Sequence, residues 1–212
     1  MSSRARSFPT RTVRHVATKG IWTPANIVTC LRVALVPAWL FAAELAGAPV
    51  PGEFQPGLAL VAVLFVLLSL TDKLDGYLAR SRDEVTTFGK FLDPIADKLV
   101  VVVSLCFLLE MGWVSPWVLL VVVAREFLVS GLRMVVASEG EVVAASDLGK
   151  WKTATTMVAI SGLLLVMALP QGTYVNLLAT AFRLCLAAAV VLTIWSGLDY
   201  FMKSWHVIVR KG

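Results

Sequence analysis

Four aspartates are the residues of this sequence most suited to chemistry. Asp72 and Asp75 end one apolar stretch, and Asp93 and Asp97 begin the next. A carboxylate inside a membrane helix costs at least about 2.5–3.5 kcal/mol, so such residues are candidates for function. Carboxylate oxygens suit Mg²⁺ or Mn²⁺, and four carboxylates suit two ions about 3.5–4 Å apart. The expected chemistry is a two-metal displacement at phosphorus, in which the entering and leaving oxygens are both stabilised.

Helical periodicity adds three neighbours to the first pair. Gly76, Ala79 and Arg80 fall on the same helix face as Asp72 and Asp75. The two small residues leave room for a nucleotide against the backbone, and Arg80 offers a planar charged donor to a phosphate. An alternative is that the aspartates form interfacial ion pairs with Lys73, Arg80, Lys90 and Lys98. Ion pairing alone gives Gly76 and Ala79 no role.

The second pair is expected at the start of a helix. Pro94 suits a first helical turn, which places Asp93 at or near the N-cap. Asp97 lies one turn further along and shares the face of Asp93. Two carboxylate pairs from adjacent helix ends can therefore converge on one site.

Composition indicates which elements must position this site. Of the 212 residues, 58% are apolar and 16% charged, against roughly 45–50% and about 25% in soluble domains. Six stretches are long enough and apolar enough to cross a bilayer, which takes about 20 helical residues. We therefore expect an all-α polytopic membrane protein, in which residues 23–203 form one six-helix domain with a polar active-site cavity facing the cytoplasm. The expected spans are 24–46, 57–80, 94–112, 115–137, 153–170 and 176–202.

The basic residues predict the orientation. Lysines and arginines gather before the first span, in the second and fourth connections and after the sixth span, whereas connections 47–56, 113–114 and 171–175 contain none. By the positive-inside rule, we expect both termini and the aspartates on the cytoplasmic side of a cell membrane. Residues 1–22 are then a basic segment on the anionic membrane surface, and residues 204–212 a short basic tail.

The N-terminal region allows two other interpretations. Residues 1–43 contain no acid and many Arg, Ser and Thr, as an organellar transit peptide does. The apolar run before Ala46-Gly47-Ala48 also imitates a cleaved signal peptide. Against cleavage, the run is long and holds Arg32, which the apolar region of a signal peptide lacks.

The spacing of the aspartate motif is similar to that of a known family. The pattern Asp72-x2-Asp75-Gly76-x2-Ala79-Arg80-x8-Gly89-x3-Asp93-x3-Asp97 resembles the complete signature of the CDP-alcohol phosphatidyltransferases. That resemblance implies a homodimer of six-helix subunits, embedded among membrane lipids, with a metal site facing the cytoplasm.

Other segments resemble one branch of the family, the branch that makes phosphatidylglycerophosphate. They begin at Thr23, Leu92, Arg125 and Ala144, and the likeness runs from about residue 22 to residue 203. Ala25 and Lys73 depart from the pattern, where a proline and an aromatic residue are more usual. Neither Ala25 nor Lys73 is among the residues expected to do the chemistry.

The resemblance also implies a reaction and a role for each motif residue. A phosphatidyl group would pass from CDP-diacylglycerol to sn-glycerol 3-phosphate, with release of CMP. Asp72, Asp75 and Asp93 would hold the metals, and Asp97 would complete the metal site and act as the general base on the acceptor hydroxyl. No nucleic-acid partner is expected. The residues that would contact the CDP moiety are Asn26, Thr29, Asp72, Asp75, Gly76, Ala79 and Arg80.

An acceptor with a phosphate dianion makes a separate physical demand. Cations should lie beside the metals, around the fourth span and the entry to the fifth. The candidate residues for the acceptor phosphate are Arg125, Arg133, Lys150 and Lys152. Glu126 and Arg133 stand on one helical stripe, so an alternative interpretation pairs these two with each other.

Other functions stay open at this point. Within the family, the acceptor could instead be phosphatidylglycerol, as in cardiolipin synthases, or an inositol phosphate. A divalent-cation transporter is a remote alternative from another class, but it needs ligands near the bilayer midplane. Away from the site, we expect Arg183 to form a structural ion pair with Glu44 or Glu110.

Overall fold

This computed structural model describes residues 23–81, 87–138 and 147–209, which contain six α-helices. No strand occurs in those residues, so the expected all-α class is confirmed for them. The helices are α1 (Pro24–Ala46), α2 (Pro56–Ser81), α3 (Thr87–Glu110), α4 (Pro116–Ser138), α5 (Asp147–Met167) and α6 (Thr173–Val209).

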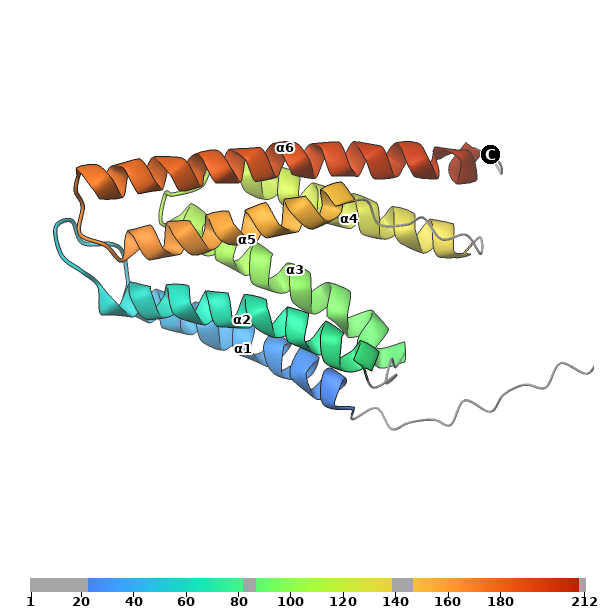
Figure 1. Ribbon diagram of the computed structural model, residues 1–212, viewed down its shortest axis with the longest axis horizontal. Coiled ribbons are helices and arrows are strands. Elements are labelled where there is room, and N and C mark those ends of the chain that lie inside the picture. The colour runs from blue at the N-terminus through green and yellow to red at the C-terminus, as the bar shows by residue number, and fades with distance from the viewer. Residues whose placement is uncertain (1–22, 82–86, 139–146, 210–212) are drawn as a thin grey trace, which may run out of the picture.

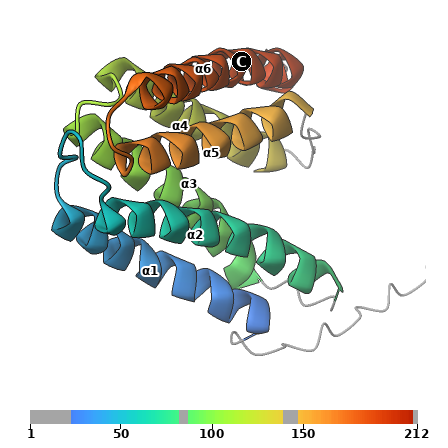
Figure 2. The same ribbon diagram turned by 60° about the vertical axis from the view of Figure 1, so that its left-hand side comes forward.

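The helices form two groups of three. α1 packs against α2 and α3, and α6 packs against α4 and α5. Contacts between α2 and α5, and between α3 and α4, join the groups. Figure 1 shows α1 and α2 along one side of the molecule and α6 along the other, and Figure 2 shows the same division after rotation.

The apolar core lies toward one end of the helices. Trp39, Phe65 and Phe107 are almost fully buried, and the Trp39 ring centroid lies 6.2 Å from that of Phe65 and 6.0 Å from that of Phe107. Trp39 Nε1 donates a hydrogen bond of 3.0 Å to the carbonyl of Val61, which satisfies the buried indole. At the same end, the backbone N–H of Gln55 donates a hydrogen bond to the carbonyl of Ala168. This end is therefore closed by apolar packing, which leaves the other end for polar residues.

Local chemistry explains where α1 begins and ends. Thr23 is its N-cap, and its hydroxyl accepts a 3.3 Å hydrogen bond from the amide of Asn26. Pro24 occupies the first turn, where its missing N–H costs nothing. Gly47 ends the helix with φ +74°, a conformation that favours glycine.

Three helices extend beyond the apolar stretches from which they were predicted. α3 begins at Thr87, so Pro94 lies inside the helix and the prediction that Asp93 is the N-cap is wrong. α5 begins at Asp147, which places Lys150 and Lys152 in its first two turns. α6 continues to Val209, through most of the segment expected as a tail. The reason is that hydropathy identifies only the apolar part of a helix, whereas its backbone hydrogen bonds continue through the polar turns at either end.

Two helical stretches of the described chain are long and apolar enough to cross a membrane, namely Asn26–Ala46 and Thr173–Trp205. Pro56–Thr71 is a shorter apolar stretch. Large apolar side chains such as Phe127 (76% exposed) and Leu184 (67% exposed) cover the outer surface. Such a surface is unusual for a monomer in water and favours a membrane environment.

The ion pair expected for Arg183 is absent from the described residues. No salt bridge joins Arg183 to Glu44 or Glu110, and both carboxylates belong to exposed residues. The guanidinium instead lies over the ring of Trp113, 5.1 Å from its centroid. The prediction of an ionic lock is therefore wrong, because an aromatic face provides a partner for the cation without burying a second charge.

Candidate functional site

The aspartate motif lies on two consecutive helices. Asp72 and Asp75 are in the last three turns of α2, and Asp93 and Asp97 are in the first three turns of α3. Residues 82–86 alone connect the two helices, so the helix ends lie within about 20 Å of each other. Helical spacing also places each pair on one side of its helix.

The side chains of this motif lie outside the described part of the structure, and so do those of Gly76, Ala79 and Arg80. Their expected roles as metal ligands, base and CDP contacts therefore stay predictions. Among the side chains that are described, no group of three or more His, Cys, Asp or Glu comes together.

A buried polar stripe on α1 is the second component of the site. Thr23, Asn26, Thr29 and Arg32 recur every three residues, and each is at most 5% exposed. Asn26 and Thr29 were expected to lie near the CDP moiety, and the helix that carries them packs against both α2 and α3. Arg32 was missed as a site residue, although a lone arginine inside an apolar run is a recognisable signal for function.

A cluster of charges joins α3, α4 and α5. The carboxylate of Glu126 in α4 forms ion pairs with Lys152 of α5, with Arg125 over 3.1 Å and with Lys98 of α3 over 3.9 Å. Lys98 Nζ also donates to the carbonyl of Glu126 over 3.3 Å. We call these four residues the Glu126 cluster. It begins one residue after Asp97, so its backbone adjoins that of the aspartate motif.

Hydroxyl groups from two helices complete the cluster. Lys98 donates to the hydroxyl of Ser130 in α4, and Arg125 donates to the hydroxyl of Ser196 in α6 over 3.3 Å. Gly197 permits this close approach of α6, because a Cβ at that position would lie 3.2 Å from Cγ of Arg125. Four helices therefore hold the cluster in place.

The cluster has more positive than negative charge. Three cations surround one carboxylate, and the four side chains are only 13–30% exposed. Nε of Arg125 is buried and has no hydrogen-bond acceptor among the described residues. A partly buried site with excess positive charge and an available donor attracts an anion such as a phosphate.

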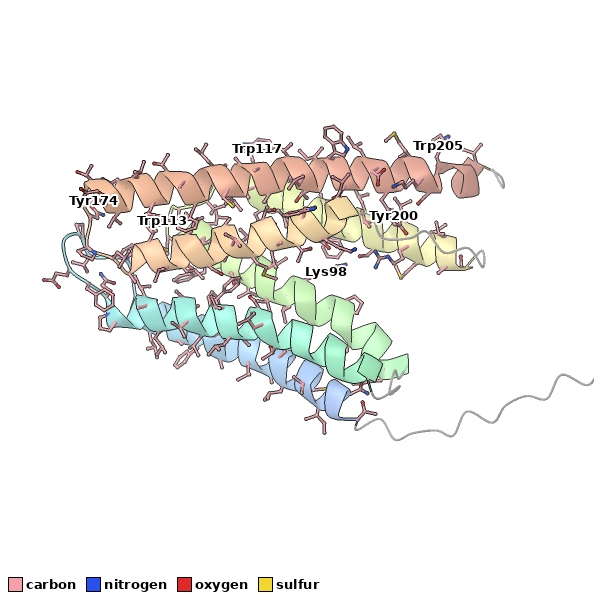
Figure 3. All side chains as sticks on the ribbon, viewed as in Figure 1. Lys98, Trp113, Trp117, Tyr174, Tyr200 and Trp205 are labelled. Atoms are coloured by element: carbon pink, nitrogen blue, oxygen red, sulfur yellow. The ribbon has the colours of Figure 1, made fainter. Side chains whose placement is uncertain are left out.

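The structure brings together two of the four cations predicted for the acceptor phosphate. Arg125 and Lys152 share Glu126, whereas Arg133 lies over the ring of Tyr200, 5.9 Å from its centroid, and Lys150 is exposed at the start of α5. The alternative pairing of Glu126 with Arg133 is wrong, since the carboxylate is taken by other cations. In Figure 3, Lys98 lies below α5, whereas Tyr200 lies beyond the N-terminal end of α5, near α4.

Sequence reasoning missed two charged members of this cluster. Lys98 was considered only as a partner for the aspartates, and Glu126 only as a partner for Arg133. The available signal was a charged pair, Arg125-Glu126, deep in an apolar run, where each charge needs a partner.

Comparison with known proteins identifies the family of this chain. Residues 22–195 match the model of the CDP-alcohol phosphatidyltransferase family. The CDP-diacylglycerol–glycerol-3-phosphate 3-phosphatidyltransferase of Bacillus subtilis (strain 168) is 40% identical over 193 residues, which are 86% of this chain and 95% of that protein. The protein of the same name from Haemophilus influenzae is 37% identical over 179 residues, covering 82% and 88% of the two chains.

A relative with another name matches over a similar length. The cardiolipin synthase (CMP-forming) of Oryza sativa subsp. japonica is 36% identical over 204 residues, which are 89% of this chain and 59% of that protein. The family match extends over most of the 212 residues and includes both helices of the aspartate motif. The chain belongs to the CDP-alcohol phosphatidyltransferase family.

Proposed function

We propose that this protein is an integral membrane enzyme that transfers a phosphatidyl group from CDP-diacylglycerol to sn-glycerol 3-phosphate, giving phosphatidylglycerophosphate and CMP. The observation that carries the proposal is the Glu126 cluster, which begins beside Asp97 and has two more positive than negative charges. An acceptor with a phosphate dianion needs such cations near the reacting phosphorus. Two of the relatives are named for this reaction.

The aspartate motif is the proposed centre for the donor and the metals. Its four carboxylates are hard oxygen donors on helix ends joined by five residues, which fits two Mg²⁺ or Mn²⁺ ions. Asp72, Asp75, Asp93 and Asp97 would hold the ions, which when bound supply positive charge to the entering and leaving oxygens. The residues proposed to receive the CDP moiety are Asn26, Thr29, Asp72, Asp75, Gly76, Ala79 and Arg80.

The proposed step is a displacement at phosphorus. A hydroxyl oxygen of glycerol 3-phosphate attacks the phosphorus that carries the diacylglycerol. A new P–O bond forms as the P–O bond to CMP breaks, and CMP leaves with the electron pair. Asp97 accepts the proton of the attacking hydroxyl. Arg125 and Lys152 hold the acceptor phosphate, and Arg133 and Lys150 add positive charge at the approach from the cytoplasm.

We extend the proposal to six membrane spans with both termini in the cytoplasm, and to a homodimer as in the family. Each helix has at least 21 residues, enough for a hydrocarbon core about 30 Å thick. Tyr174 and Trp205, near opposite ends of α6 in Figure 3, are exposed aromatic residues of the kind that mark membrane interfaces. Cysteine accessibility at both chain ends in intact and opened cells tests the topology.

A second candidate acceptor is phosphatidylglycerol, as the rice relative is named cardiolipin synthase. The experiment that separates the two is an acceptor panel on purified protein with CDP-diacylglycerol and Mg²⁺ or Mn²⁺. Glycerol 3-phosphate, phosphatidylglycerol and inositol phosphate are compared by CMP release and by mass spectrometry of the lipid product. Cardiolipin as the main product would replace the proposed function, and no CMP with any acceptor would refute it.

A further inference from the structure

We propose that Glu126 is a positioning residue, whose carboxylate holds Lys98, Arg125 and Lys152 in a convergent array before the acceptor phosphate arrives. The inference rests on the proposed function and deepens it. It assigns a role to an acidic residue inside a site whose ligand is itself an anion. No role in the reaction follows for this residue from charge attraction alone, because a carboxylate repels a phosphate.

The geometry shows why a carboxylate is useful there. The two lysines come from α3 and α5, and each reaches Glu126 of α4 with its ammonium group. Lysine side chains are long and lose considerable freedom when they are ordered. If Glu126 orders the two lysines in the free enzyme, binding of the acceptor does not have to order them. The affinity of the enzyme for the acceptor therefore rises through preorganisation.

The charges support the same conclusion. With Glu126, the cluster has two more positive than negative charges, which matches the two negative charges of the acceptor phosphate. Without it, three like charges would repel each other in a site where the Lys152 side chain is only 13% exposed. Lys98, with its side chain 30% exposed, would move toward water. The cations would then be separated when the acceptor arrives.

Glu126→Gln distinguishes positioning from simple charge. Charge attraction predicts tighter binding of glycerol 3-phosphate, because the variant has more positive charge. Positioning predicts weaker binding, with KM for glycerol 3-phosphate raised about ten-fold or more and KM for CDP-diacylglycerol changed less than about two-fold. Glu126→Asp keeps the charge at a shorter reach and should raise the acceptor KM by about three-fold. Glu110→Gln is the matched control, since Glu110 is an exposed carboxylate in α3 outside the cluster, and its KM values should equal those of the wild type.

A binding measurement covers the case in which turnover is lost. Glycerol 3-phosphate should raise the unfolding temperature of the full-length wild type and of Glu110→Gln in detergent, and should do so much less for Glu126→Gln and partly for Glu126→Asp. An acceptor KM or thermal shift that is unchanged or improved in Glu126→Gln overturns the inference. Glu126→Asp gives the same test if Glu126→Gln does not fold. If the wild type itself does not use glycerol 3-phosphate, the proposed function fails instead, so the two failures are distinct.

Discussion

The ring of Phe182 in α6 lies directly against Gly162 in α5. A Cβ built at Gly162 would overlap three atoms of that ring, so only glycine permits this contact. Gly162 is buried, and α5 and α6 form the most extensive helix pair of the described chain. This contact therefore fixes how closely α6 approaches the helix that carries Lys152.

Gly162→Ala should destabilise the protein by about 1–3 kcal/mol, because the added methyl group forces the ring or the helix to move. The measurement is unfolding in detergent by heat or denaturant. Gly131→Ala is the matched control, since a Cβ there meets nothing within 4 Å. It should leave stability unchanged or raise it by up to about 1 kcal/mol, through the better helix propensity of alanine. Equal stability of the two variants would contradict the close contact.

Removal of divalent metal should abolish activity, and Mg²⁺ or Mn²⁺ should restore it. Asp72→Asn should lose metal binding, measured by calorimetry, together with activity. Asp97→Asn should keep most of its affinity for CDP-diacylglycerol but lose nearly all turnover, because the base that accepts the hydroxyl proton is gone. Asp199→Asn is the control, as this aspartate pairs with Lys203 on α6. Full activity in Asp97→Asn would remove that residue as the base.

Lys152→Ala should raise KM for glycerol 3-phosphate by about ten-fold or more, the effect of losing a charged hydrogen bond. Arg133→Ala should raise it by less, about two- to three-fold, because Arg133 is exposed and lies against Tyr200. Lys203→Ala is the control cation and should change neither KM. If Lys152→Ala weakens only the binding of CDP-diacylglycerol, these cations serve the donor and the acceptor pocket lies elsewhere.

Arg183→Ala should lower stability by about 0.5–1 kcal/mol through loss of its contact with the Trp113 ring, with activity unchanged. Trp113→Leu should lose the same interaction. In a double-mutant cycle the two losses should therefore not add. Strictly additive losses would show that the cation and the ring do not interact in solution.

The sequence by itself determined the helical class, the family and the positions of the aspartate motif along the chain. These depend on short-range properties. Helical spacing alone puts Asp72 beside Asp75 and Asp93 beside Asp97, whatever the rest of the chain does. Helical spacing likewise puts Asn26 and Thr29 on one face of α1, but only the structure shows that this face is buried.

The tertiary structure alone decided which charges meet. Lys98 and Lys152 stand 28 residues before and 26 residues after their contacts at Glu126, on different helices. Their meeting depends on how α3, α4 and α5 rotate and cross, which no local pattern specifies. For the same reason, the guanidinium of Arg133 lies over the ring of Tyr200, although Arg133 shares a helical stripe with Glu126. The guanidinium of Arg183 likewise lies over the ring of Trp113. A charge in an apolar helix requires a partner, but only the packing of the helices determines which partner lies within reach.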